Sequence, residues 1–326
     1  MNALSLPSLR ESDGRPIDSV ERTPETLAAM RTWRWQITHP AVIWLPALVL
    51  IYLCMGVATG ILGLVAYYVS EDVPVMLLLV AGVRIAAIVG YGLIVWLERR
   101  KPYELRSPMT MSALGLGIGT SLMSLIVGLV YLCGGIELSG MRAEVPWAML
   151  FVVSIAPAVA DEILNRGVLF RYLEQIFGTW ASLVVSGVMF GVAHLANPRV
   201  GFWEFVSITI EAGFLFGLIY ILFRSLWLVI GIHIGWNFVR GPVFGSGASH
   251  TSGYESWIVS SPAGSTILSG GNVGVEASVI APLLSLLIIA WLVRVAIQRH
   301  AIAAPFWASS TAHSEYRRRV RQRSLQ

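Results

Sequence analysis

A small set of polar side chains in apolar stretches of the chain could carry out hydrolytic chemistry. A carboxylate and a histidine can together remove a proton from water, and a second histidine with an amide can stabilise the oxyanion that forms when this water attacks a carbonyl. No Ser-His-Asp or Cys-His pattern is evident in the sequence. The set comprises Asp161, Glu162 and Arg166 in "DEILNR", Phe190 and His194 in "FGVAH", and His233 and Asn237 in "HIGWN".

The spacing within "DEILNR" assigns different tasks to its two acids. Glu162 and Arg166 are four positions apart, in the order that favours an ion pair on one helical face. Asp161 points about 100° away around the same helix. A charged side chain at mid-bilayer costs at least ~2.5–3.5 kcal/mol, so such residues usually face protein or a water-filled cavity. We therefore predict a Glu162–Arg166 pair, with Asp161 as the candidate base.

A turn in "IFGTW" predicts which polar groups meet. Gly178 in this segment is a plausible connection between two antiparallel helices, and such a hairpin brings positions equidistant from the turn to the same height. Asp161 and His194 are almost equally distant from Gly178 along the chain. A carboxylate and an imidazole at one level form a general-base arrangement.

A metal-dependent mechanism is the alternative chemistry for the same residues. His194, His233 and Glu162 would give the two-nitrogen, one-oxygen ligand set of a hydrolytic zinc site with water as the fourth ligand. The sequence contains no His-Glu-x-x-His motif that would strengthen this interpretation. We favour the mechanism without a metal or other cofactor and keep zinc as the alternative.

The elements that must position these residues are membrane helices. The chain has 326 residues, of which 56% are hydrophobic and 13% charged, and its mean hydropathy is +0.70. This balance is far from that of a soluble domain. It predicts an all-α polytopic membrane protein with about eight transmembrane helices of about 20 residues, enclosing a polar site. The expected spans are 41–69, 74–97, 109–133, 146–176, 179–196, 203–223, 226–241 and 277–298.

Basic residues predict the orientation, because Lys and Arg concentrate in cytoplasmic loops. The segment "ERRKPYELR" and the tail "YRRRVRQR" fall on one side, whereas the Gly/Ser-rich loop near 243–275 contains no Lys or Arg. We predict a multi-pass protein of the cell membrane with a cytoplasmic polar segment 1–40, a transmembrane domain 41–298 and a basic cytoplasmic tail 299–326. We expect the tail to be a solvated, positively charged segment on the cytoplasmic side, without a role in binding anionic lipid or nucleic acid.

The three motifs, in this order, resemble those of the CPBP, or Abi, intramembrane proteases, which include the type II CAAX prenyl endopeptidases. The flanking "RG" and "HLANP" agree, and the resemblance covers roughly 146–275. It implies that Asp161 and His194 activate water and that His233 and Asn237 stabilise the oxyanion, with Arg166 and Phe190 in support. Asp161 stands where the family usually has Glu. Its side chain is one methylene shorter, so its carboxylate lies ~1.5 Å further back, and such a displacement can lower the rate that a catalytic base supports.

The sequence leaves three functions open. The first is an endopeptidase that cleaves a membrane-associated protein or peptide in the lipid bilayer. The second is a catalytically weak relative that acts as a membrane scaffold or a bacteriocin-immunity-type binding protein. The third is an ion transporter, against which we find no repeated halves. Glu211, in the sixth expected span, stays outside the catalytic set because a structural pairing is at least as plausible.

Overall fold

The structure is a computed structural model that describes residues 46, 73–98, 102–195, 197, 200–246, 256–271 and 273–305. The predicted N-terminal segment, the expected span 41–69 except residue 46, and the tail beyond residue 305 lie outside this part. The α-helices are α4 (Val73–Glu98), α5 (Pro108–Leu132), α6 (Trp147–Glu162), α7 (Arg171–His194), α8 (Phe202–Ile208), α9 (Phe216–Phe223), α10 (Leu226–Phe238), α11 (Thr266–Ser269) and α12 (Ile280–Gln298).

Three π-helical segments continue these helices. They are η2 (Ile163–Phe170) between α6 and α7, η3 (Thr209–Leu215) between α8 and α9, and η4 (Val239–Val243) after α10. Two short 3₁₀ segments, η1 (Tyr103–Leu105) and η5 (Val275–Ala277), lie in connections. π-helical turns are rare and occur frequently at functional sites, so their positions direct attention to the residues that they contain.

The described residues include four helical segments that are long and apolar enough to cross a membrane: Pro108–Leu132, Leu150–His194, Phe202–Phe223 and Ile280–Gln298. The second contains a non-helical residue, Gly178 (φ 77°, ψ 173°), and therefore comprises the expected fourth and fifth spans. The apolar part of α4, Ile85–Glu98, is shorter. The protein is mostly helical, as predicted, while the count of eight spans stays a prediction.

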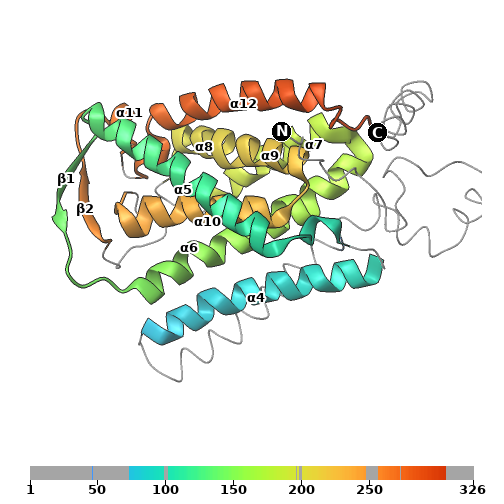
Figure 1. Cartoon of the computed structure of the whole chain (residues 1–326), viewed down its shortest axis with the longest axis horizontal. Helices are drawn as coiled ribbons and strands as arrows, with labels where there is room; N and C mark the ends of the chain where they lie inside the picture. Colours follow the sequence, from blue (N-terminus) through green and yellow to red (C-terminus); the bar gives the residue numbers. More distant parts are fainter. Residues whose placement is uncertain are drawn as a thin grey trace, which may run out of the picture.

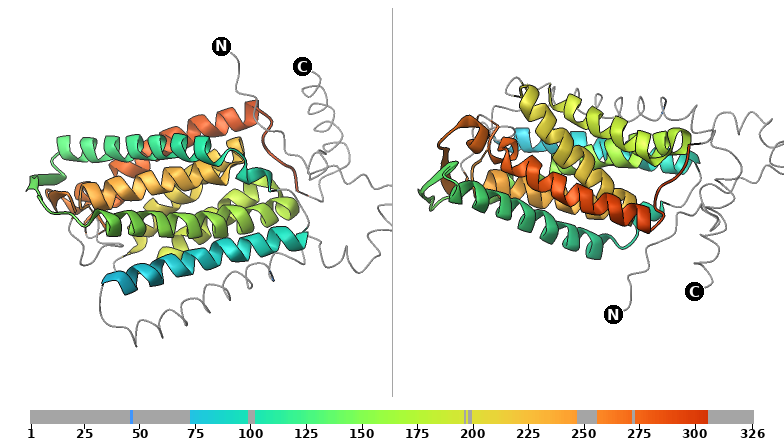
Figure 2. Two further views of the ribbon diagram at one scale, coloured as in Figure 1. Left: turned by 60° about the horizontal axis from the view of Figure 1, so that its bottom comes forward. Right: turned by 90° about the horizontal axis from the view of Figure 1, so that it is seen from above.

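The long helices run side by side along the bundle, with α10 in its interior (Figure 1). Helix α10 is packed between α5 and α6, and α7 lies against η3. Helix α4 covers α6 on one face, and α12 lies against η3 and α9 on another (Figure 2). The part of α10 that contains His233 and Asn237 is therefore enclosed by other helices.

Glycines allow α10 and α5 to approach closely. A Cβ atom on Gly119 of α5 would lie 2.0 Å from the carbonyl oxygen of Ile232, and one on Gly231 of α10 would lie 2.4 Å from that of Ser112. Small residues permit such backbone contact between membrane helices, where van der Waals packing drives association. The contact fixes the part of α10 that contains His233.

The structure corrects the all-α expectation at one end of the bundle. Strands β1 (Ile136–Met141) and β2 (Ile258–Pro262) form a two-stranded antiparallel sheet with an irregularity between Leu138 and Gly140. The two strands are short and far apart in the sequence, so neither gave a periodic signal long enough to predict a strand. The sheet lies at one end of the helix bundle (Figure 1).

Candidate active site

Glu162, the last residue of α6, is fully buried and has two partners. Nη1 of Arg166 lies 3.1 Å from both oxygens of the Glu162 carboxylate. Nδ1 of His233 lies 3.0 Å from Oε1 of the same carboxylate. The ion pair that the spacing predicts is thus present, and Glu162 also connects α6 to α10, a contact that the sequence did not predict.

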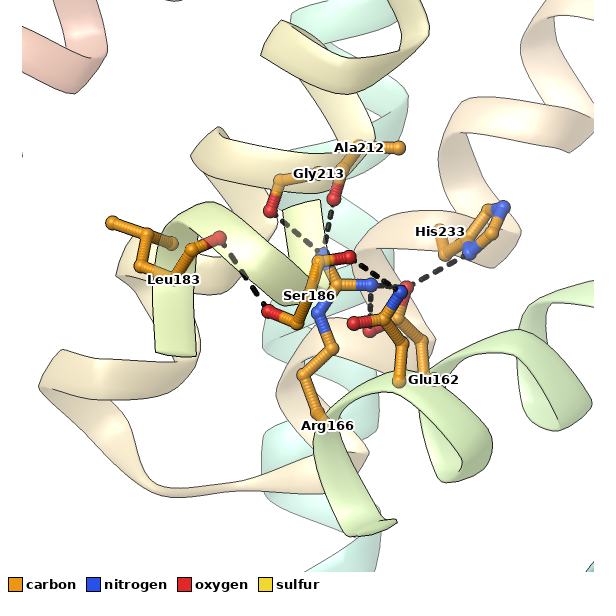
Figure 3. Close-up of polar contacts among 8 residues, drawn as sticks. Glu162, Arg166, Leu183, Ser186, Ala212, Gly213 and His233 are labelled. Atoms are coloured by element: carbon orange, nitrogen blue, oxygen red, sulfur yellow. Dashed lines mark hydrogen bonds and ion pairs between the residues drawn. The ribbon is translucent and has the colours of Figure 1, made fainter. Parts of the chain in front are cut away.

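Arg166 connects this carboxylate to two more helices. Its Nη2 atom donates to the carbonyl oxygens of Ala212 and Gly213 in η3, the second at 3.1 Å. Its guanidinium carbon lies 5.1 Å from the ring centre of Phe190 in α7, within the range of a cation–π contact. Figure 3 shows Arg166 between Glu162 and the two η3 carbonyls. Arg166 is 1% exposed, so these contacts compensate a charge that water does not reach.

Two contacts cross the hairpin at Gly178. Arg166 and Phe190, which are equally distant from Gly178 along the chain, contact each other across the hairpin. Nδ2 of Asn165 also donates to the backbone oxygen of Ser186 at 3.1 Å. This hydrogen bond between the two helices was not predicted from the sequence.

The hydrogen bonds of the two histidines determine which ring nitrogen carries the proton. Nδ1 of His194 lies 2.9 Å from the backbone oxygen of Phe190, and a carbonyl oxygen can only accept. Nδ1 of His233 faces the ionised Glu162 in the same way. In the neutral rings, both Nδ1 atoms therefore donate, and Nε2 has the lone pair. Each Nε2 atom is the nitrogen suited to take a proton or bind a metal.

Both histidines line one cavity. Aromatic rings surround them: His194 stacks on Phe190 at 4.9 Å between ring centres, and His233 lies 5.7 Å from Phe216. Trp236 packs edge-on against Phe216. The lining residues are Phe190, His194, Ile208, Glu211, Ala212, Phe216, His233, Trp236, Asn237, Arg240 and Glu276.

The two predicted acids hold different places relative to this cavity. Glu162 does not line the cavity and contacts Nδ1 of His233, which does. Asp161 is half-buried on α6, and neither acid is among the described residues that line the cavity. The structure thus brings His194, His233 and Asn237 to a common space, with Glu162 and Arg166 supporting them. The roles assigned to Asp161 and the other residues stay predictions.

Three ionisable residues of the cavity were outside the predicted set. Glu211, Arg240 and Glu276 are 2%, 4% and 7% exposed, and Nη1 of Arg240 pairs with Oε1 of Glu276. The spacing of His233, Asn237 and Arg240 along one helical face could have indicated Arg240. Glu276 lies in η5, on a distant connection, and had no local signal.

The side chains of the described part do not assemble a recognisable metal site. No group of three His, Cys, Asp or Glu residues among them is arranged to hold a metal ion. Glu162 contacts Nδ1 of His233 rather than the side of the ring where Nε2 lies. Nε2 of His194 and Nε2 of His233 are the nitrogen donors that a metal ion would use at this cavity.

The segment that carries the three motifs matches a known protein family. Residues 143–239 match the family model described as type II CAAX prenyl endopeptidase Rce1-like. This segment is Rce1-like. The resemblance predicted from the three motifs is thereby confirmed, and the Rce1-like segment contains all of them. It covers less than half of the chain and ends one residue before Arg240. No curated protein and no solved structure matches the chain.

Proposed function

We propose that the chain is an intramembrane endopeptidase that hydrolyses a peptide bond of a membrane-associated protein or peptide. The Rce1-like segment supports a CAAX-type intramembrane protease. The observation that carries the proposal is that two histidines with fixed Nδ1 atoms face one cavity together with Asn237. Four helical segments of the described part are long and apolar enough to cross a membrane.

In the proposed reaction, Nε2 of His194 takes a proton from water, assisted by Asp161, and the hydroxide attacks the scissile carbonyl. The amide of Asn237 donates to the developing oxyanion. His233 can donate from Nε2 only as an imidazolium, because its other nitrogen faces Glu162. The Glu162 carboxylate stabilises that positive charge, which gives the buried acid a function in this scheme.

Purified protein in liposomes, incubated with a library of membrane peptides, tests the proposal. We expect wild-type protein to generate new peptide ends and His194→Ala to lose about 100-fold or more of the rate, as for removal of a general base. The variant should be compared at equal helical content by circular dichroism. Equal cleavage by both proteins would contradict the proposal.

Chelation separates the metal-free scheme from the zinc alternative. If His194 and His233 held zinc, the metal would lower the pKa of its bound water and generate the nucleophile. Activity would then disappear with a chelator and return with added zinc. We expect activity to persist in the chelator, because a carboxylate–histidine pair requires no metal.

A catalytically weak binding protein is the second candidate function. The observation in its favour is Asp161, which has a shorter side chain than the usual Glu of the family and is not among the described residues lining the cavity. Such a protein would bind a membrane peptide without cutting it. Retention of library peptides by wild-type protein, with no new peptide ends, would support this candidate over the endopeptidase.

A further inference from the structure

Glu211 is a buried acid in the wall of the cavity that the proposed reaction does not yet use. It lies in the π-helical segment η3 and is 2% exposed. Its carboxyl accepts one hydrogen bond, from Oγ of Ser207 at 3.4 Å. Within the described ranges it forms no ion pair, since Arg240 pairs with Glu276 instead. Glu211 therefore faces the cavity with most of its hydrogen-bonding capacity unused.

Other buried acids of the protein show what a structural carboxylate looks like here. Glu162 pairs with Arg166, and Glu174 pairs with Arg224 through both of its oxygens. Burying an ionised carboxylate without such a partner is costly, whereas the neutral carboxyl avoids this cost and has a proton to donate. Unlike Glu162 and Glu174, Glu211 has no arginine partner within the described ranges, and this favours the protonated form that a proton donor requires.

We propose that Glu211 is the general acid that protonates the leaving amine during peptide hydrolysis. This inference rests on the proposed endopeptidase function. An amine is a poor leaving group unless its nitrogen gains a proton as the C–N bond breaks, and a positioned acid supplies that proton. Glu211 lines the same cavity as His194, His233 and Asn237, which places its carboxyl in the space where the proposed reaction occurs.

The proton balance of the two steps closes. In the first step, water transfers a proton to Nε2 of His194 while its oxygen bonds to the scissile carbon. In the second step, the C–N bond breaks, and the nitrogen takes the proton of the Glu211 carboxyl. The His194 imidazolium then returns its proton to Glu211 through cavity water. The products are a carboxylic acid and an amine, and the enzyme regains its initial state.

Leaving-group dependence tests this role. The library peptide that wild-type protein cleaves fastest is prepared with its scissile amide and, separately, as a p-nitrophenyl ester of the same acyl segment. Nitrophenolate leaves without a proton, so Glu211→Gln should slow amide cleavage about 100-fold or more and ester cleavage less than about threefold. The glutamine keeps the shape of the side chain and can still accept from Ser207.

Matched variants separate the possible failures. Glu204→Gln alters an acid of α8 that accepts from the backbone N–H of Gly201, outside the cavity lining, and should leave both rates unchanged. His194→Ala should slow both substrates, because both require activated water. Equal slowing of amide and ester by Glu211→Gln, or slowing of neither, would overturn the general-acid role while wild-type cleavage stands. Absence of amide cleavage by wild-type protein would overturn the endopeptidase function itself and the general-acid role with it.

Discussion

The histidines of the site are oriented by acceptors of two kinds. His194 is held by the carbonyl of Phe190 one turn earlier in its own helix, whereas His233 is held by a carboxylate from another helix. A buried carboxylate that also pairs with Arg166 can orient an imidazole and stabilise its charged form. In the proposed reaction, Glu162 therefore acts through its hydrogen bond to His233.

The predicted base gives the first prediction. Asp161→Asn should abolish peptide cleavage, and Asp161→Glu should retain or raise it by restoring the reach usual in the family. Glu162→Gln should lower stability by about 3–5 kcal/mol, because it leaves the buried Arg166 without its counter-charge, and should slow cleavage by folded protein less than Asp161→Asn does, because it weakens the support of His233 and leaves the base in place. Initial cleavage rates and thermal unfolding of the three variants measure these effects. Near-wild-type turnover by Asp161→Asn, with loss of turnover in folded Glu162→Gln, would mean that the two roles are reversed.

Contacts between residues that are near in the sequence were easier to predict than contacts between distant helices. The Glu162–Arg166 pair and the turn at Gly178 follow from local spacing and from a glycine with positive φ. The Glu162–His233 contact joins residues 71 positions apart, and spacing does not reveal such a partner. Likewise, no periodic pattern identifies a π-helical turn, so the placement of Glu211 required the fold.

The close approach of α5 and α10 gives a prediction at the scale of elements. Gly119→Ala places a methyl group against the backbone of Ile232, the residue before His233, and should destabilise the protein by about 1–3 kcal/mol. Gly117→Ala on the same helix is the matched control, since no atom lies within 4 Å of its added Cβ. The unfolding temperature and the cleavage rate should both fall for Gly119→Ala and stay unchanged for Gly117→Ala. Equal effects of both substitutions would show that the crossing does not position His233.

At the scale of the whole molecule, the β1–β2 sheet marks one end of the helix bundle (Figure 1). The positive-inside rule predicts that the basic segments of the sequence face the cytoplasm. The lining residue Glu276 belongs to the connection at the sheet end, so the cavity extends toward that side of the bundle.

Reporter fusions test this orientation. A reporter after Gln326 and one inserted within 246–270 should report opposite sides of the membrane, with the C-terminus in the cytoplasm. The insertion range includes part of the connection between η4 and β2. The same side for both reporters would contradict the predicted number of spans.

Peptide-bond hydrolysis at the two-histidine cavity is the central claim, and isotope incorporation tests it most directly. Wild-type protein and His194→Ala are incubated in liposomes with the membrane-peptide library in water labelled with oxygen-18, and the products are analysed by mass spectrometry. The account predicts labelled oxygen in each newly formed carboxyl group for the wild-type protein, because the attacking nucleophile is water, and almost none for the variant. Labelled products at the same rate from both proteins, or no new peptide ends from the wild-type protein, would contradict it.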